Sequence, residues 1–280
     1  MNNILFVDKP AGISSFDVCF KLRKILNTRK IGHTGTLDPN ATGVMIVLYE
    51  KATKANQFLV SDSKEYYTRV LLGINTDTLD IDGNIIEERE YILPEKNELE
   101  TVFMQFTGDL KQEVPITSAV RVNGERLYRY QQKKQEVQLP VRNVHVYSLH
   151  LDQIFPDGFS FNCKVSSGTY IRALVRDMLR QLDLPGTVAE LRRTAIDHVK
   201  IEDCDPLDQI LKGNYRSHNL LELLSNRYET IKLDDLTDVR NGKPLRLEGH
   251  KEEILISDGK EAVAIYQKKE GLYRCVRGLW

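Results

Sequence analysis

Runs of apolar and alternating residues predict several strands in the first part of the chain. Residues 3–7 and 44–49 are continuous apolar runs, and the first of them leads into a turn predicted at Asp8 to Gly12. Residues 64–74 alternate between polar and apolar side chains, and residues 159–165 form another short strand-like segment. Continuous apolar runs are typical of buried strands, whereas alternation is typical of strands with one buried face.

The last part of the chain has a different pattern. After about residue 226, short alternating runs at 253–257, 262–266 and 273–276 are separated by glycines. Short strands with turn residues between them are typical of a small β-rich unit. We therefore expect a separate β-rich domain at residues 226–280, following a larger domain at residues 1–225.

Three segments have the spacing of amphipathic helices. Ser14 or Ser15 is expected to cap the first, and residues 95–106 form the second. The third follows Gly168, and Arg172, Arg176 and Arg180 fall four residues apart on the side opposite its apolar face. The apolar face of the first helix is predicted to consist of Val18, Leu22, Ile25 and Leu26.

The loop at residues 32–43 presents one carboxylate in surroundings with little bulk or charge. Glycines 32, 35 and 43 allow unusual backbone angles and close approach of another molecule, and Pro39 restricts Asp38 to extended conformations. The apolar strand predicted at 44–49 would anchor this loop. Asp38 is therefore a candidate reacting group, although most Asp-Pro pairs serve only in turns.

Composition excludes several classes of protein. The chain has 280 residues and a formal net charge of −1, so no global positive field indicates permanent residence on nucleic acid. Its four cysteines are scattered without a C-x-x-C pair, and we predict no metal site. The apolar runs are too short to span a membrane, and there is no dinucleotide-binding or P-loop motif. We expect a cytoplasmic protein without a cofactor.

Two local regions are basic despite the neutral total. No acid interrupts residues 18–37, which is the pattern of a solvated helix face or of a surface that holds an anionic substrate. The segment 115–140 combines cations with Tyr128 and Tyr130, and basic and aromatic side chains together are typical of RNA contacts. Its candidate RNA-binding residues are Arg121, Arg126, Lys133 and Lys134.

The turn at residues 76–83 is acidic, and its spacing resembles a calcium loop only superficially. Aligning Asp80, Asp82 and Gly83 to that loop puts Thr78 first and Arg89 last, where carboxylates are required. We therefore predict a hairpin turn here and no calcium site.

With these elements in order, the chain resembles the bacterial tRNA pseudouridine-55 synthases of the TruB type. The motifs that carry the resemblance are Asp8-Lys9-Pro10 with Gly12-Ile13-Ser14-Ser15, Gly32 to Pro39 through Gly43, Lys64-x-Tyr66, the turn at 76–83, Ser118-Ala119, Ser167 to Arg172, and Leu191-Arg192-Arg193-Thr194. The chain departs from the family pattern at Thr117, where a tyrosine is usual, and at Gln131-Gln132, where Ala-Arg is expected.

The resemblance implies an α+β fold of the pseudouridine synthase type, with a large mixed or antiparallel sheet flanked by helices and a PUA-like C-terminal domain. It implies isomerisation of a uridine in the T-loop of tRNA, at position 55. By position, Asp38 matches the catalytic aspartate, Tyr66 the residue that stacks on the base, Arg172 the partner of the catalytic carboxylate and His33 the residue that displaces the nucleotide. Further substrate contacts are implied for Lys9, Gly35, Thr36, Asp77 and Tyr170.

The resemblance also implies that segment 115–140 closes over the T-arm of tRNA, and we expect a monomer without an obligate protein partner. Two alternatives remain open at this stage. One is a non-catalytic module that binds or folds tRNA on the same scaffold. The other is a hydrolase that uses Asp38 with Asp77 or Asp80, which requires the two carboxyl groups about 5–10 Å apart.

Overall fold

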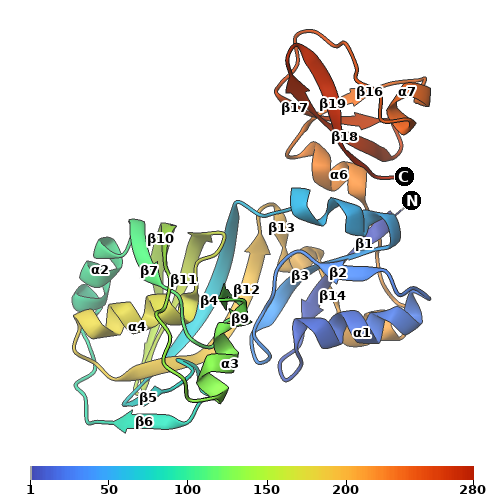
Figure 1. Cartoon of the computed structure of the whole chain (residues 1–280). Coiled ribbons are helices and arrows are strands. Elements are labelled where there is room, and N and C mark those ends of the chain that lie inside the picture. Colours follow the sequence, from blue (N-terminus) through green and yellow to red (C-terminus); the bar gives the residue numbers. More distant parts are fainter. Residues whose placement is uncertain (1) are drawn as a thin grey trace. The chain divides into compact units, whose positions relative to one another are not determined.

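The computed structural model describes residues 2–280, which divide into two compact units. Unit 1 contains residues 2–39, 43–60 and 201–280, and unit 2 contains residues 40–42 and 61–200. The elements appear in Figure 1 in sequence colours. Within residues 2–280, no helix combines the length and the apolar content that crossing a bilayer requires.

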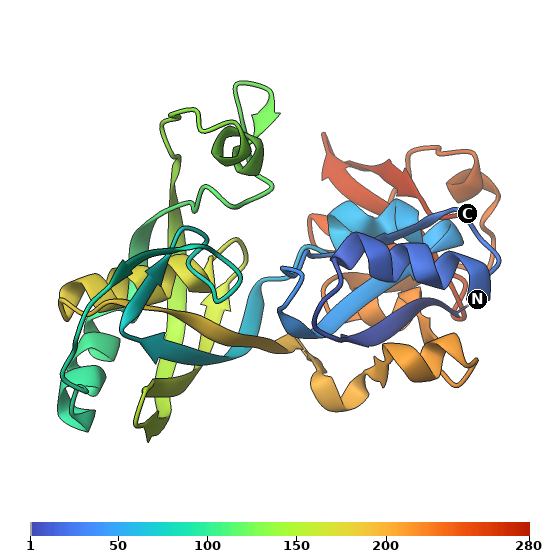
Figure 2. The same ribbon diagram turned by 90° about the horizontal axis from the view of Figure 1, so that it is seen from below.

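The first part of unit 1 is a small sheet covered by helices. Strand β1 pairs antiparallel with β3 and β15 and parallel with β14, and β2 pairs with β3. Figure 2 shows α1 lying across this sheet. The elements are β1 (Asn2–Lys9), α1 (Ser15–Ile25), β2 (Ile31–His33), β3 (Thr42–Tyr49), the 3-10 helices η1 (Glu50–Phe58) and η2 (Ile201–Asp203), β14 (Asp205–Pro206), α5 (Leu207–Leu211), β15 (His218–Asn219) and α6 (Leu220–Ser225).

Helix α1 forms where its sequence predicts. The Ser14 hydroxyl accepts a hydrogen bond from the Asp17 amide at 3.1 Å, and the Asp17 carboxylate accepts from the Ser14 amide at 3.1 Å, which completes a capping box. Val18 and Leu22 pack against β1 and β3 in one buried cluster, with Leu26 against its edge. The prediction for Ile25 was wrong, because this side chain is 36% exposed. The turn predicted at Asp8 begins later, since β1 continues to Lys9.

The C-terminal part of unit 1 is a four-stranded sheet with its own core. Strand β16 pairs parallel with β17, and β18 lies antiparallel between β17 and β19. Tyr266 and Tyr273 are fully buried in its apolar cluster. The three strands predicted here are confirmed, and the elements are β16 (Glu229–Lys232), α7 (Thr237–Arg240), β17 (Glu253–Ser257), β18 (Ala262–Lys269) and β19 (Leu272–Gly278).

Unit 2 is built on a long antiparallel sheet. Its strands follow the order β12, β4, β11, β10 and β7, and β13 pairs with the end of β12. Helices α2 and α4 pack beside these strands (Figure 1). The elements are β4 (Ser63–Leu72), β5 (Ile74–Thr76), β6 (Ile85–Glu88), α2 (Lys96–Gln105), β7 (Gly108–Glu113), β8 (Arg121–Val122), β9 (Glu125–Arg126), α3 (Leu127–Gln132), β10 (Val141–Phe155), β11 (Gly158–Ser166), α4 (Ile171–Gln181), β12 (Gly186–Ile196) and β13 (Val199–Lys200).

Two features of unit 2 bear on function. Strands β5 and β6 form the hairpin predicted from the acidic turn. The segment 115–140 carries β8, β9 and α3 and projects from the sheet in Figure 2. Helix α4 follows Gly168 as predicted, but Arg172 does not lie on an exposed face, because only 5% of its surface is accessible.

The capping box predicts a measurable cost for its loss. Ser14→Ala should lower the free energy of unfolding by about 1 kcal/mol, because the first turn of α1 loses its side-chain acceptor. Urea denaturation measures this change. Ser14→Thr keeps a hydroxyl and serves as the matched control, and equal stability of the alanine and threonine variants would contradict the assigned cap.

Candidate functional site

The loop that carries Asp38 is attached to the start of α1 just before the carboxylate. The buried Ser15 hydroxyl accepts a hydrogen bond from the Leu37 amide at 2.8 Å and donates to the Leu37 carbonyl at 3.0 Å. Leu37 itself is buried, with 4% of its surface accessible. One hydroxyl therefore satisfies both backbone polar groups of a buried residue and fixes the backbone next to Asp38.

The same loop is attached again just after the carboxylate. The Pro39 carbonyl accepts from the Lys9 ammonium at 2.7 Å and from the Gly12 amide at 3.1 Å. Gly12 has φ +82°, a conformation that favours glycine. The Lys9 side chain is fully buried and donates also to the Pro10 carbonyl at 2.9 Å. Lys9 therefore holds the loop, and its contact with the substrate stays a prediction.

Asp38 is thus the residue between two fixed neighbours. Its side chain is half-buried, as is Gly35, whereas Thr36 is exposed. The predicted residue His33 is the last residue of β2 and lies opposite Val47 of β3. Because the backbone on both sides of Asp38 is held, this part of the loop loses little conformational freedom when the carboxylate meets a substrate.

Tyr66, the second predicted catalytic residue, lies on β4, between β12 and β11. It is buried (7% exposed) and lies opposite Cys163 of β11 and Arg193 of β12. Directly paired residues share a face of the sheet, so Arg193 and Tyr66 project on the same side. Lys64 projects there too, because it precedes Tyr66 by two residues.

Burial of Lys64 changes its chemistry. Desolvation lowers the pKa of its ammonium to about 8, with a further lowering from Arg193 and an opposing effect of Asp197. The ammonium donates to the Ser167 hydroxyl at 3.3 Å. Lysines with a lowered pKa are enriched at functional sites, and neither Lys64 nor Arg193 had been singled out beyond its motif.

The turn at residues 76–83 is held by its own side chains. The Asp77 carboxylate accepts from the Asn84 amide at 2.9 Å and from the Asn84 side chain at 3.1 Å. A Cβ on Gly83 would lie 2.6 Å from the Asp77 carboxylate, so only glycine fits. The Asp77 carboxylate therefore closes the hairpin, and its contact with the substrate stays a prediction.

Arg172 joins this turn to the segment 115–140. Its guanidinium donates to the Thr78 carbonyl at 2.6 Å, to the Thr117 hydroxyl at 2.7 Å and to the Thr117 carbonyl at 3.0 Å. It also lies 3.4 Å from the Asp80 carboxylate. Thr117 and Gln131, where the chain departs from the family pattern, both contact this turn. The Thr117 hydroxyl donates to the Thr78 carbonyl at 3.4 Å, and the Gln131 side chain donates to the Asp77 carbonyl at 3.3 Å.

The remaining predicted RNA contacts of unit 2 lie on or near this segment. Arg121 and Arg126 are paired across β8 and β9 and are exposed, as is Lys134. Lys133 forms an ion pair with Glu125 at 2.7 Å. Tyr170 directly precedes α4. Its amide donates to the Gln112 side chain at 2.8 Å, and its carbonyl accepts from the same side chain at 3.1 Å.

The predicted site residues therefore fall into two groups. Lys9, His33, Gly35, Thr36 and Asp38 belong to unit 1, and the others belong to unit 2. Among residues 2–280, no cluster of three or more His, Cys, Asp or Glu side chains has the arrangement of a metal site. The pairing of Arg172 with Asp38 stays a prediction, and Asp80 is the carboxylate that Arg172 contacts within unit 2.

Comparison with known proteins identifies relatives over nearly the whole chain. The family model described as TruB family pseudouridylate synthase (N terminal domain) matches residues 23–171. The tRNA pseudouridine synthase B of Lactobacillus acidophilus is 34% identical over 287 residues, covering 98% of this chain and 97% of the relative. That of Caldanaerobacter subterraneus subsp. tengcongensis is 37% identical over 249 residues, covering 88% and 87%.

Solved structures share the fold. The protein in a structure of an H/ACA RNP bound to a substrate RNA containing 2'-deoxyuridine matches with a TM-score of 0.74 and 22% identity, over 99% of this chain and 84% of that one. A Cbf5-Nop10-Gar1 complex matches with a TM-score of 0.73, 22% identity, and coverage of 100% and 85%. The α+β fold class predicted from the sequence is confirmed.

The contacts of Arg172 predict a local change in stability. Arg172→Lys should raise hydrogen exchange at residues 76–80 and 115–118, because a single ammonium cannot reach all the acceptors and leaving one unsatisfied costs about 1–3 kcal/mol. Hydrogen exchange read by mass spectrometry measures the effect. Arg180→Lys, on an exposed part of the same helix, is the control. Unchanged exchange in Arg172→Lys would contradict the assigned bridge.

Lys64 predicts a specific pH dependence. Its folded pKa of about 8 lies below the ordinary value of 10.5, so between these pH values the unfolded chain binds more protons and the wild type gains stability as pH rises. Lys64→Met should therefore be more stable than wild type at pH 7, and this advantage should shrink between pH 8 and 10. Urea unfolding at each pH gives the difference. Lys164→Met removes a half-exposed lysine from the neighbouring strand and is the matched control, and an equal trend in both variants would contradict the assignment to Lys64.

Proposed function

Because the chain belongs to the TruB family of pseudouridylate synthases, we propose that it is a tRNA pseudouridine synthase that converts a uridine of tRNA to pseudouridine. The observation that supports the proposal is that hydrogen bonds hold the loop at Leu37 and at Pro39, directly before and directly after Asp38. From the sequence resemblance, we place the target at position 55 in the T-loop.

The reaction detaches uracil from the ribose, rotates it and rejoins it through carbon, so reactant and product are isomers. It needs no change of oxidation state and therefore no redox cofactor from this chain. An aspartate carboxyl is ionised at neutral pH, so the task of the protein is to place the carboxylate. Attack on the ribose, removal of a sugar proton and addition to the uracil ring all require a charged carboxylate at the nucleotide.

The target base must leave the stack of the tRNA loop, which costs a few kcal/mol. We propose that the ring of Tyr66 stacks on the extruded base and that His33 displaces the nucleotide. Arg172 is proposed to pair with the Asp38 carboxylate. The exposed cations of segment 115–140, together with Tyr128, supply contacts to the phosphates and bases of the T-arm. We place the RNA-binding C-terminal domain at residues 226–280 and expect a cytoplasmic monomer.

The two alternatives have less support. A hydrolase needs a second free acid, but the Asp77 carboxylate closes the hairpin and the Asp80 carboxylate contacts Thr78 and Arg172. A non-catalytic tRNA-binding module would have no use for a carboxylate fixed on a loop. Neither alternative is therefore favoured.

The proposal is tested with tRNA that carries tritium at C5 of uracil, which is released when the new carbon–carbon bond forms. The wild type should release tritium, and Asp38→Asn should release none while its affinity for tRNA is retained, because the amide keeps the shape but loses the charge.

Glu202→Gln removes an exposed carboxylate from the same unit, outside residues 226–280, and is the matched control. Circular dichroism verifies that all variants fold. Undiminished release by Asp38→Asn would remove this residue from the chemistry. Binding without release by the wild type would instead favour the non-catalytic module.

A further inference from the structure

Helix α1 exposes two aromatic rings that its own core does not use. Phe16 and Phe20 are each 62% exposed, whereas Val18 and Leu22 are fully buried on the opposite face. Residues four apart lie one above the other on a helix, so the two rings form one apolar surface. Exposed apolar side chains that gather in this way are typical of binding surfaces.

Three cations surround these rings. Lys21 and Lys24 are exposed, and the Arg23 guanidinium lies 5.8 Å from the centre of each ring. Within the described chain, residues 2–280, no carboxylate forms an ion pair with any of the three. Asp17 is the acid on this surface; its carboxylate accepts hydrogen bonds from the amide and hydroxyl of Ser14 and also interacts electrostatically with Lys21, which leaves two of the three positive charges without an acid on this surface. The surface therefore keeps a positive charge.

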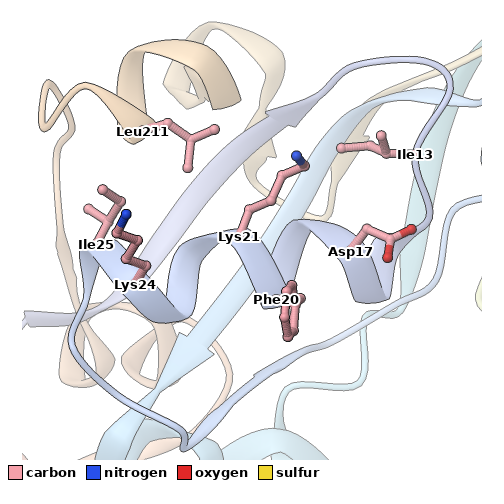
Figure 3. Close-up of a pocket in the computed structure, with 7 residues that line it drawn as sticks. All are labelled: Ile13, Asp17, Phe20, Lys21, Lys24, Ile25 and Leu211. Carbon is pink, nitrogen blue, oxygen red and sulfur yellow. The ribbon is translucent and has the colours of Figure 1, made fainter.

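A hollow of about 620 Å³ is lined by one of the two rings, that of Phe20 (Figure 3). Asp17, Lys21 and Lys24 also line it from α1, and Leu211 lines it from α5. This volume is in the range of sites that hold small organic groups. We call the combination of Phe16, Phe20, Lys21, Arg23, Lys24 and this hollow the α1 patch.

We propose that the α1 patch binds an unpaired nucleotide of the tRNA substrate, distinct from the uridine that meets Asp38. Phosphates are attracted by the three cations, and a base has an exposed ring to stack on and a hollow to enter. Rings alone would suit an apolar protein partner and cations alone would suit duplex phosphates, whereas the combination suits single-stranded RNA. The proposal rests on the proposed function for the identity of its ligand.

The position of the patch on the chain supports a role next to the reaction. Ser15, which holds Leu37 beside Asp38, directly precedes Phe16. The helix has 11 residues and rises about 1.5 Å per residue, so its full length is roughly 17 Å. The α1 residues of the patch therefore lie within that distance of Ser15, measured along the helix axis. An RNA that delivers one nucleotide to Asp38 therefore has neighbouring nucleotides within reach of α1.

Affinity for a full-length tRNA transcript tests the proposal. The double variant Phe16→Ala, Phe20→Ala should raise Kd about fivefold or more, since stacking of one base contributes on the order of 1–3 kcal/mol. Its slope of log Kd against log salt should match that of wild type. Lys24→Ala should also weaken binding, but with a slope smaller by about 1, because it removes a phosphate contact.

Matched controls separate this effect from general surface change. Met104→Ala removes an exposed apolar side chain from α2, and Lys51→Ala removes an exposed cation from η1. Both should bind the transcript as wild type does. In the unaltered protein, acetylation by an amine-reactive reagent should be reduced at Lys21 and Lys24 when the transcript is bound, but not at Lys51.

Three results would overturn the proposal or separate it from the proposed function. Wild-type Kd in the double variant, with Lys21 and Lys24 acetylated equally with and without RNA, would overturn it. An RNA-independent dimer that the double variant abolishes in sedimentation would make the patch a self-association surface and also overturn it. Absence of tritium release by the wild type would refute the proposed function, while the binding comparison would still decide whether the patch holds RNA.

Discussion

The geometry of the candidate site depends on a buried ammonium and a buried hydroxyl that hold one short loop. Lys9 and Ser15 lie on either side of the turn between β1 and α1, and they fix Pro39 and Leu37, the two neighbours of Asp38. Burying an ammonium is costly unless its hydrogen bonds are satisfied, and the Pro39 and Pro10 carbonyls provide that compensation. The backbone on both sides of Asp38 is thus held by hydrogen bonds to Lys9, Gly12 and Ser15.

Unit 2 uses the same principle with a different cation. Arg172 is nearly inaccessible, and its fork of donors reaches the Thr78 carbonyl together with the hydroxyl and carbonyl of Thr117. Guanidinium geometry suits this task because its donors point in several fixed directions. The chain departs from the family pattern at Thr117 and Gln131, and both residues contact the hairpin turn, so these substitutions belong to one local arrangement.

Patterns between near neighbours made much of the structure predictable. The serine cap of α1, the strand at β3 and the hairpin after β5 depend on residues within a few positions of each other, and each formed as expected. Burial of Lys9 and Arg172 could not be predicted in this way. The partner of Lys9 is 30 residues away, and those of Arg172 are 55 and 94 residues away. Helical spacing placed Arg172 opposite the apolar face but gave no sign that another segment covers it.

The bridge made by Arg172 also limits how segment 115–140 can move. Lifting the segment at Thr117 would break the two hydrogen bonds that the Arg172 guanidinium donates to Thr117, whereas the residues around β8 and β9 are joined mainly to each other. Gln131 also attaches the segment to the Asp77 carbonyl. We therefore expect movement of the segment to be greatest between Thr117 and Gln131, where β8 and β9 lie.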